Sequence, residues 1–268
     1  MLLETLIKEL NDDSLYRFHL AKTNPDGHRP LDALAKSDDA WLKWQIYPGN
    51  KKERFIKNNI VSFAQINGNS FLFGGIFHIK ERTENAYKVE YSQQYQDLIG
   101  RLIIEYNGDN QRGTVFLPKY IFKNSIIKGI YETRYRGEKF QGFENINHSF
   151  IEIEVIVKNK LNDWKAALSS VFGIYLITDT ATGMHYIGSA YGEHGIWGRW
   201  INYVYNFHGN NKDLIELFGS KGESYIKNHF KFAILEVIPS SKSIDEVITK
   251  ESLWKKKLLT RQFGYNCN

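Results

Sequence analysis

The sequence predicts an α+β protein in which a mostly β N-terminal domain is followed by a small α/β domain. Between residues 60 and 117, β-branched and aromatic runs alternate with Gly, Asn and Asp clusters, which is the spacing of strands and turns. Beyond residue 171, strand-like runs alternate with longer segments of helical periodicity. This change of pattern predicts a domain over residues 1–140, a connector over 141–168 and a second domain over 169–268.

The N-terminal domain contains most of the predicted strands. Residues 1–14 carry leucine and isoleucine at helical spacing, so a short amphipathic helix is expected there. A second short helix is expected over residues 30–36, after a turn at 24–27. The strands are expected at 60–66, 70–82, 86–91, 98–106 and 113–117. A barrel-like arrangement is one form that such strands take.

The second half has a different order of elements. The connector holds an apolar run over 151–157 that fits either a helix or a strand, and a short helix is expected from residue 162. Two strands, at 173–178 and 184–190, are joined by a predicted hairpin turn. The remaining elements are helices at 196–205 and 213–229, a strand at 230–238, and a helix at 244–260 that opens with a capping-box sequence.

The composition excludes several classes of protein. The 268 residues are 42% hydrophobic and 24% charged, which is typical of a folded soluble protein. The single cysteine, Cys267, excludes a disulfide framework and a multi-cysteine zinc site. No stretch approaches the roughly 18 consecutive apolar residues of a membrane span, and the acidic N-terminus does not resemble a signal peptide. No membrane partner is therefore expected, and the predicted location is cytoplasmic.

Charge and aromatic content leave the partner open. The net charge of +5 and the pI near 9.0 fit a polyanion such as DNA without requiring one. Aromatic residues make up 15% of the chain. Most of them are expected in the core, and the remainder are candidates for stacking on unpaired bases.

The predicted helix at 244–260 carries a carboxylate in an apolar stripe. Val247, Glu251, Trp254 and Leu258 share one face of this helix. A carboxylate among apolar neighbours needs a partner, because an unpaired buried charge is costly. The pattern alone is compatible with a bound cation, with an Arg or Lys partner such as Lys255 at i+4, with hydrogen-bond donors, and with a position at the rim of the core.

The predicted helix at 196–205 presents a similar choice. Arg199 lies beside an apolar face made of Ile196, Trp200, Tyr203 and Val204. A half-buried guanidinium pairs with a carboxylate or with a phosphate. The pattern is compatible with an ion pair to Glu251 and with an anchor for a phosphate group.

The hairpin adds a motif. Gly173-Ile174-Tyr175 is followed, ten residues later, by Tyr186-Ile187-Gly188. Together with Arg199, Glu251 and Asn266 in this order, the region from residue 171 to 268 resembles the GIY-YIG nuclease superfamily. The resemblance implies a three-stranded antiparallel sheet flanked by helices, and a DNA endonuclease that hydrolyses phosphodiester bonds.

The resemblance also implies roles for the motif residues. Glu251 would hold one divalent cation, Mg²⁺ or Mn²⁺, which stabilises charge on the phosphate and the leaving group. Arg199 would contact the scissile phosphate. Tyr175 or Tyr186 would activate or position the attacking water, with a pKa lowered by nearby positive charge, and Asn266 would close the site by hydrogen bonding.

Neighbouring loop residues are weaker candidates. His194 is either an exposed loop histidine or a contact for water or the leaving group. Ser189 stands where the repair nucleases of the superfamily often have lysine, and the loop over 188–199 is longer than in compact members of the superfamily. Gly173 and Gly188 are interpreted as backbone requirements for close packing or a bulge.

The N-terminal domain is the expected place for DNA recognition, because a nuclease domain of about one hundred residues offers little surface for it. Cations stand beside aromatic residues in two of its segments, and these cations are candidate phosphate contacts: Lys51, Lys52, Arg54, Arg134, Arg136 and Lys139. Solvated loops are the alternative interpretation. Trp41 and Trp44 are either core residues or stacking partners for a flipped base.

Three functional hypotheses follow. The first is a metal-dependent DNA endonuclease of restriction or defence type with an N-terminal targeting domain. The second is a non-catalytic nucleic-acid-binding protein. The third is an adaptor whose N-terminal domain binds protein. Only phosphate contacts would give DNA binding that weakens steeply with salt.

Overall fold

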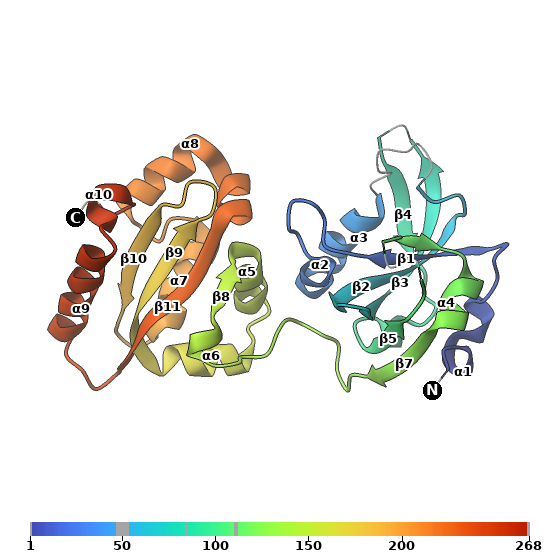
Figure 1. Cartoon of the computed structure of the whole chain (residues 1–268), viewed down its shortest axis with the longest axis horizontal. Coiled ribbons are helices and arrows are strands. Elements are labelled where there is room, and N and C mark those ends of the chain that lie inside the picture. Colours follow the sequence, from blue (N-terminus) through green and yellow to red (C-terminus); the bar gives the residue numbers. More distant parts are fainter. Residues whose placement is uncertain (1, 47–53, 84, 110–111, 267–268) are drawn as a thin grey trace. The chain divides into compact units, whose positions relative to one another are not determined.

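The computed structural model describes residues 2–46, 54–83, 85–109 and 112–266 (Figure 1). This part of the chain forms two compact units, Met1–Arg136 and Gly137–Asn268. Over the same residues, no helix combines the length and the apolar character needed to cross a membrane.

Unit 1 is built on a mixed sheet that has seven strands in the described ranges, in the order β6-β1-β2-β3-β5-β7, with β4 paired to β3. Only β1 (Tyr16–Ala21) and β2 (Asn59–Asn67), among the described pairs, are parallel. The other strands are β3 (Ser70–Arg82), β4 (Tyr87–Tyr91), β5 (Leu102–Tyr106), β6 (Val115–Phe116) and β7 (Ser125–Ile130).

Two helices supply the connection that the parallel strands β1 and β2 require. A parallel connection needs a crossover, which a helix usually supplies, and α2 (Pro30–Lys36) and α3 (Asp38–Ile46) lie between β1 and β2 in the sequence. The sequence pattern predicted α2 but not α3. The remaining helical segments of unit 1 are α1 (Glu4–Ile7), η1 (Lys8–Leu10), η2 (Gln96–Leu98) and α4 (Pro118–Asn124).

Aromatic side chains fill the core of unit 1. Phe18, Phe63 and Phe73 are fully buried, and the Phe63 ring contacts both the Phe18 ring and the Phe73 ring. Trp41 is also fully buried, and its indole nitrogen donates to the carbonyl of Gly74 at 2.8 Å. A Cβ at Gly74 would lie 2.4 Å from the Trp41 ring. Trp41 is therefore a core residue and is not available to stack on a base.

A buried polar network crosses this core. The Arg54 guanidinium lies 2.6 Å from Nε2 of His19, and Nδ1 of His19 lies 2.9 Å from Oε1 of Gln45. Because arginine only donates hydrogen bonds, Nε2 accepts and Nδ1 carries the proton. Burial lowers the pKa of His19 well below its ordinary value, and the positive charge of Arg54 lowers it further. His19 is therefore neutral at pH 7.

Unit 2 contains a sheet of four strands within the described residues, in the order β10-β9-β11-β8, and all of its pairs are antiparallel. The strands are β8 (Asn147–Ser149), β9 (Val171–Asp179), β10 (His185–Ala190) and β11 (Phe230–Pro239). The expectation of three strands was wrong by one. The fourth, β8, comes from the segment expected as a connector, because its residues pair with the start of β11.

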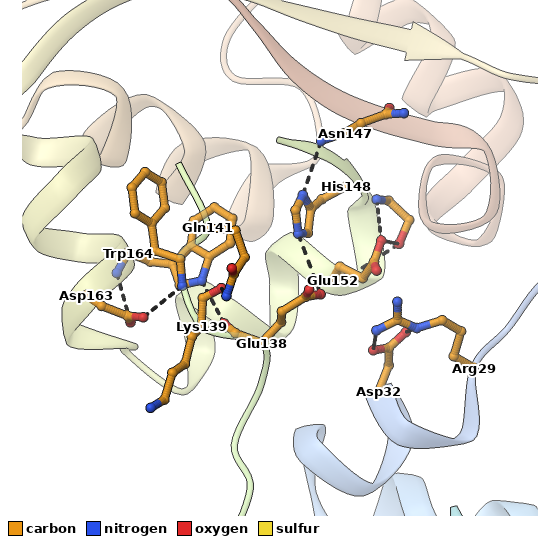
Figure 2. Close-up of polar contacts among 12 residues, drawn as sticks. Arg29, Asp32, Glu138, Lys139, Gln141, Asn147, His148, Glu152, Asp163 and Trp164 are labelled. Carbon is orange, nitrogen blue, oxygen red and sulfur yellow. Dashed lines mark hydrogen bonds and ion pairs between the residues drawn. The ribbon is translucent and has the colours of Figure 1, made fainter. Parts of the chain in front are cut away.

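The rest of the expected connector also belongs to unit 2. The apolar run becomes a helix because Ser149 and Glu152 form a capping box at its start. Upstream, the indole nitrogen of Trp164 donates to the carbonyl of Glu138 at 2.7 Å, and Asp163 accepts from the backbone N–H of Phe140 at 2.8 Å (Figure 2). The chain from residue 138 is thus fixed to unit 2 by specific contacts.

Helices cover both faces of this sheet. One face packs against α5 (Phe150–Lys158), α6 (Asn162–Ser169), α7 (Gly195–Asn206) and α8 (Lys212–His229). The other face packs against α9 (Ile244–Lys257), which the short helix α10 (Thr260–Phe263) follows (Figure 1). The remaining element is η3 (Phe143–Asn145). β10 is the edge strand, so groups from α7 and from α9 reach it from opposite faces.

Candidate active site

The β9–β10 hairpin places the two motif tripeptides side by side. Tyr175 pairs with Gly188, and Tyr186 pairs with Ile177. The Tyr175 ring lies across Gly188, so that a Cβ there would be 2.2 Å from the Tyr175 hydroxyl oxygen. At Gly173, a Cβ would lie 2.9 Å from the Glu236 carbonyl, next to a bulge in β11. Both glycines therefore serve close packing, in agreement with the prediction from the sequence.

Three tyrosines meet on the α7 face of the hairpin. Tyr175 and Tyr203 are fully buried, and Tyr186 is 6% exposed. The hydroxyl oxygens of Tyr175 and Tyr203 are 3.0 Å apart, and the Tyr186 ring packs on both residues. Tyr203 was assigned only to an apolar face from the sequence. Its position one helical turn after Arg199 is the signal that would have placed it in the site.

Arg199 projects from α7 onto this cluster. The neighbouring Tyr175 hydroxyl raises the pKa of Arg199 above its ordinary value, with smaller contributions from Tyr203 and Tyr186, while burial acts in the opposite direction. Nε of Arg199 is buried and has no hydrogen-bond partner among the described residues. A buried donor without an acceptor is costly. This N–H is therefore suited to receive an anionic oxygen from a ligand.

Tyr186 keeps its proton at neutral pH. Burial raises its pKa, and Tyr175 and Glu251 add to the increase, whereas Tyr203 and Arg199 act to lower it. The lowered pKa expected for a water-activating tyrosine is thus not found at Tyr186, because desolvation outweighs the nearby positive charge. A neutral phenol can still accept a hydrogen bond from a water molecule and orient it.

Glu251 approaches the edge strand from the α9 face. Its Oε2 accepts a hydrogen bond from the Ser189 hydroxyl on β10, and its Oε1 lies 2.8 Å from the Lys255 ammonium. Its side chain is 17% exposed. The hydrogen bond from Ser189 places Glu251 beside β10, and the Glu251 charge adds to the raised pKa of Tyr186 on the same strand. Of the partners expected for Glu251, the structure contains the ion pair with Lys255 and a hydrogen-bond donor, Ser189.

Asn266 holds the edge strand. Its amide nitrogen donates to the carbonyl of Ile187, and its side-chain oxygen accepts from the N–H of Ile187, both at 2.8 Å. The side chain is fully buried and acts as the next strand would at this position. The hydrogen bonds of Asn266 thus go to the backbone of β10.

His194 occupies the N-cap position of α7, is exposed, and makes no side-chain capping bond. It therefore lies at the start of the helix that carries Arg199. No contact between His194 and the tyrosine cluster is found in the described part of the chain.

The donor set suits a magnesium-type cation. Within the described ranges, no group of three or more His, Cys, Asp or Glu side chains could hold a metal ion by itself. Mg²⁺ commonly takes one or two carboxylates and fills its remaining positions with water and substrate phosphate oxygens. Glu251 offers one such carboxylate beside β10. The residues therefore fit a cation that is shared with a phosphate.

The cations expected to contact DNA phosphates have different surroundings in the structure. Arg54 is engaged with His19 in the core network of unit 1, and Arg134 forms an ion pair with Asp38 at 2.5 Å. Arg136 and Lys139 are exposed, and Figure 2 shows the Lys139 side chain directed away from Trp164. Two further candidates, Lys51 and Lys52, lie outside the described residues.

No protein-family model matches the chain, and no curated protein matches it. Among solved structures, the chain is similar to the catalytic domain of the homing endonuclease I-TevI, with 31% identity and a TM-score of 0.29 over 36% of this chain and 98% of that chain. It is also similar to a mutant of the catalytic domain of the intron endonuclease I-TevI, with 28% identity and a TM-score of 0.29 over 37% of this chain and 94% of that chain. The solved structures named here are thus endonuclease catalytic domains.

Proposed function

We propose that unit 2 is a DNA endonuclease of the GIY-YIG type, which hydrolyses phosphodiester bonds with one Mg²⁺ or Mn²⁺ ion. The observation that carries the proposal is the buried Nε of Arg199, which has no hydrogen-bond partner in the described ranges and lies near the tyrosine hydroxyls, together with the Glu251 carboxylate at edge strand β10. Independent structural roles give no reason for a guanidinium, phenols and a carboxylate to gather around one strand. A site that hydrolyses a phosphodiester can use each of them: the guanidinium for the phosphate, the carboxylate for a metal ion and a hydroxyl to position water.

Each group has a defined task in this proposal. The Arg199 guanidinium donates to a non-bridging oxygen of the scissile phosphate and neutralises charge that grows in the transition state. The protonated Tyr186 orients the attacking water, and Tyr175 and Tyr203 hold Arg199 and Tyr186 in place. Glu251 would hold the cation, which supplies charge stabilisation for the phosphate and the leaving oxygen when it is bound.

The decisive test is cleavage of plain and base-modified DNA with Mg²⁺ by the full-length protein and by Glu251→Gln. The expected result is a loss of cleavage of more than about 100-fold with DNA binding largely retained. Glu216→Gln removes an exposed carboxylate from α8 and is the matched control. Cleavage by Glu251→Gln at the rate of the control would exclude Glu251 as the cation ligand.

Unit 1 is assigned the role of DNA targeting in this proposal, in a restriction or defence enzyme. The net positive charge of the chain and the exposed Arg136 support it. The test is DNA binding by unit 1, residues 1–136, over a range of salt concentrations. A steep decrease with salt supports phosphate contacts, whereas no binding would favour a protein-binding adaptor. DNA binding by a full-length protein that cuts no DNA would favour a non-catalytic binding protein.

A further inference from the structure

A nearly buried lysine lies next to the proposed cation ligand. The Lys255 side chain is 7% exposed, and its ammonium lies 2.8 Å from Oε1 of Glu251. The next two residues of α9, Lys256 and Lys257, are exposed. A lysine is seldom buried unless it is paired. The burial of Lys255 is thus specific to its position beside Glu251.

Both carboxylate oxygens of Glu251 are already engaged. Ser189 donates to Oε2, and the Lys255 ammonium holds Oε1. A divalent cation on this carboxylate would be a like charge within a few ångströms of the ammonium. At the boundary of a protein interior, such a repulsion is worth several-fold more than in water. The cation and the ammonium therefore compete for one ligand.

We propose that Lys255 is the resident counter-ion of Glu251, and that a divalent cation loads onto Glu251 only by displacing the Lys255 ammonium. Lys255 then sets the affinity of the site and is a positioning residue, not a catalytic one. The ion pair also spares the protein an unpaired, partly buried carboxylate when no cation is bound. This inference rests on the proposed function only for the identity of Glu251 as the cation ligand.

The test is a Mn²⁺ titration of the full-length protein without DNA, followed by electron paramagnetic resonance of free Mn²⁺. Lys255→Met removes the charge at similar side-chain length, and we expect Mn²⁺ to bind about tenfold more tightly or better. Lys256→Met removes the same charge from an exposed position one residue away, and its affinity should match that of the wild type. Adding Glu251→Gln to Lys255→Met should abolish the gain.

Lys255→Gln keeps a hydrogen-bond donor near Oε1 without the charge, and it provides the same measurement if Lys255→Met does not fold. Unchanged or weaker Mn²⁺ binding in the folded Lys255 variants would overturn the inference. An equal gain in Lys256→Met would also overturn it, since net charge alone would then explain the effect. A gain confined to the Lys255 variants in a protein that cuts no DNA would refute the nuclease proposal and leave this inference standing.

Discussion

Gly188→Ala is the substitution whose effect follows most directly from the structure. The new Cβ would lie 2.2 Å from the Tyr175 hydroxyl oxygen and 2.4 Å from Cζ of the same ring. Non-bonded carbon atoms rest at about 3.5–4.0 Å, so the ring must move by more than about 1 Å. Tyr175 is fully buried and is hydrogen-bonded to Tyr203. The ring therefore cannot move without disturbing its neighbours.

These contacts determine how much Gly188→Ala should change the stability and the cleavage rate. Overpacking of a filled core costs about 1–3 kcal/mol, and the lost hydrogen bond between Tyr175 and Tyr203 costs about 1 kcal/mol more. The free energy of unfolding should thus fall by about 2–4 kcal/mol. A shift of about 1 Å in the group that holds Arg199 should also lower the cleavage rate by about 100-fold.

Urea unfolding and DNA cleavage by the full-length protein measure the two effects. Gly219→Ala in α8 is the control, because no heavy atom lies within 4 Å of its added Cβ. It should raise stability by about 0.5–1 kcal/mol, as alanine is the better helix former. Combining Gly188→Ala with Tyr175→Ala should cost less than the sum of the two. A Gly188→Ala protein of wild-type stability and activity would refute this reasoning.

Three further predictions concern other contacts. Arg199→Lys should lower cleavage by about 100- to 1000-fold with DNA binding nearly unchanged, because lysine lacks the Nε donor; rates within about tenfold of wild type would argue against a phosphate contact. Asn266→Ala should lower the free energy of unfolding by about 1–3 kcal/mol in urea titrations, since the backbone of Ile187 loses both of its hydrogen bonds to the Asn266 side chain; an unaltered midpoint would contradict this. The free energy of unfolding should decrease as the pH falls below 6.5, the ordinary pKa of histidine. The reason is that His19 takes up a proton at a higher pH in the unfolded chain than in the folded protein. This loss approaches about 1.4 kcal/mol per pH unit, and His19→Gln should remove it from urea titrations repeated between about pH 7 and pH 5; equal slopes in both proteins would refute it.

The local pattern was sufficient for many of the elements. The predicted strand at 70–82 coincides with β3, and the predicted helix at 30–36 coincides with α2. The capping-box sequence before residue 244 forms the box at Ser243 and Glu246. These features depend on interactions between residues close in sequence, which periodicity and cap chemistry report directly.

In the middle of the chain, the elements depend on long-range pairing, which the local sequence pattern does not report. The segment over 141–168 has no periodicity that distinguishes a connector from part of a domain. Its strand β8 is only three residues long and is stable because β11 pairs with it. The role of Arg54 was equally hidden, because its partner His19 lies 35 positions earlier in the sequence.

The sequence by itself determined which residue types stand in the hairpin and on the two helices that follow the motif. Only the tertiary structure decided how they meet. It placed Tyr203 against Tyr175, left Nε of Arg199 without a partner among the described residues, and brought Ser189 to Glu251. The physical reason is that burial and pairing depend on which faces of distant elements pack together, and a single chain's pattern records the face but not its partner.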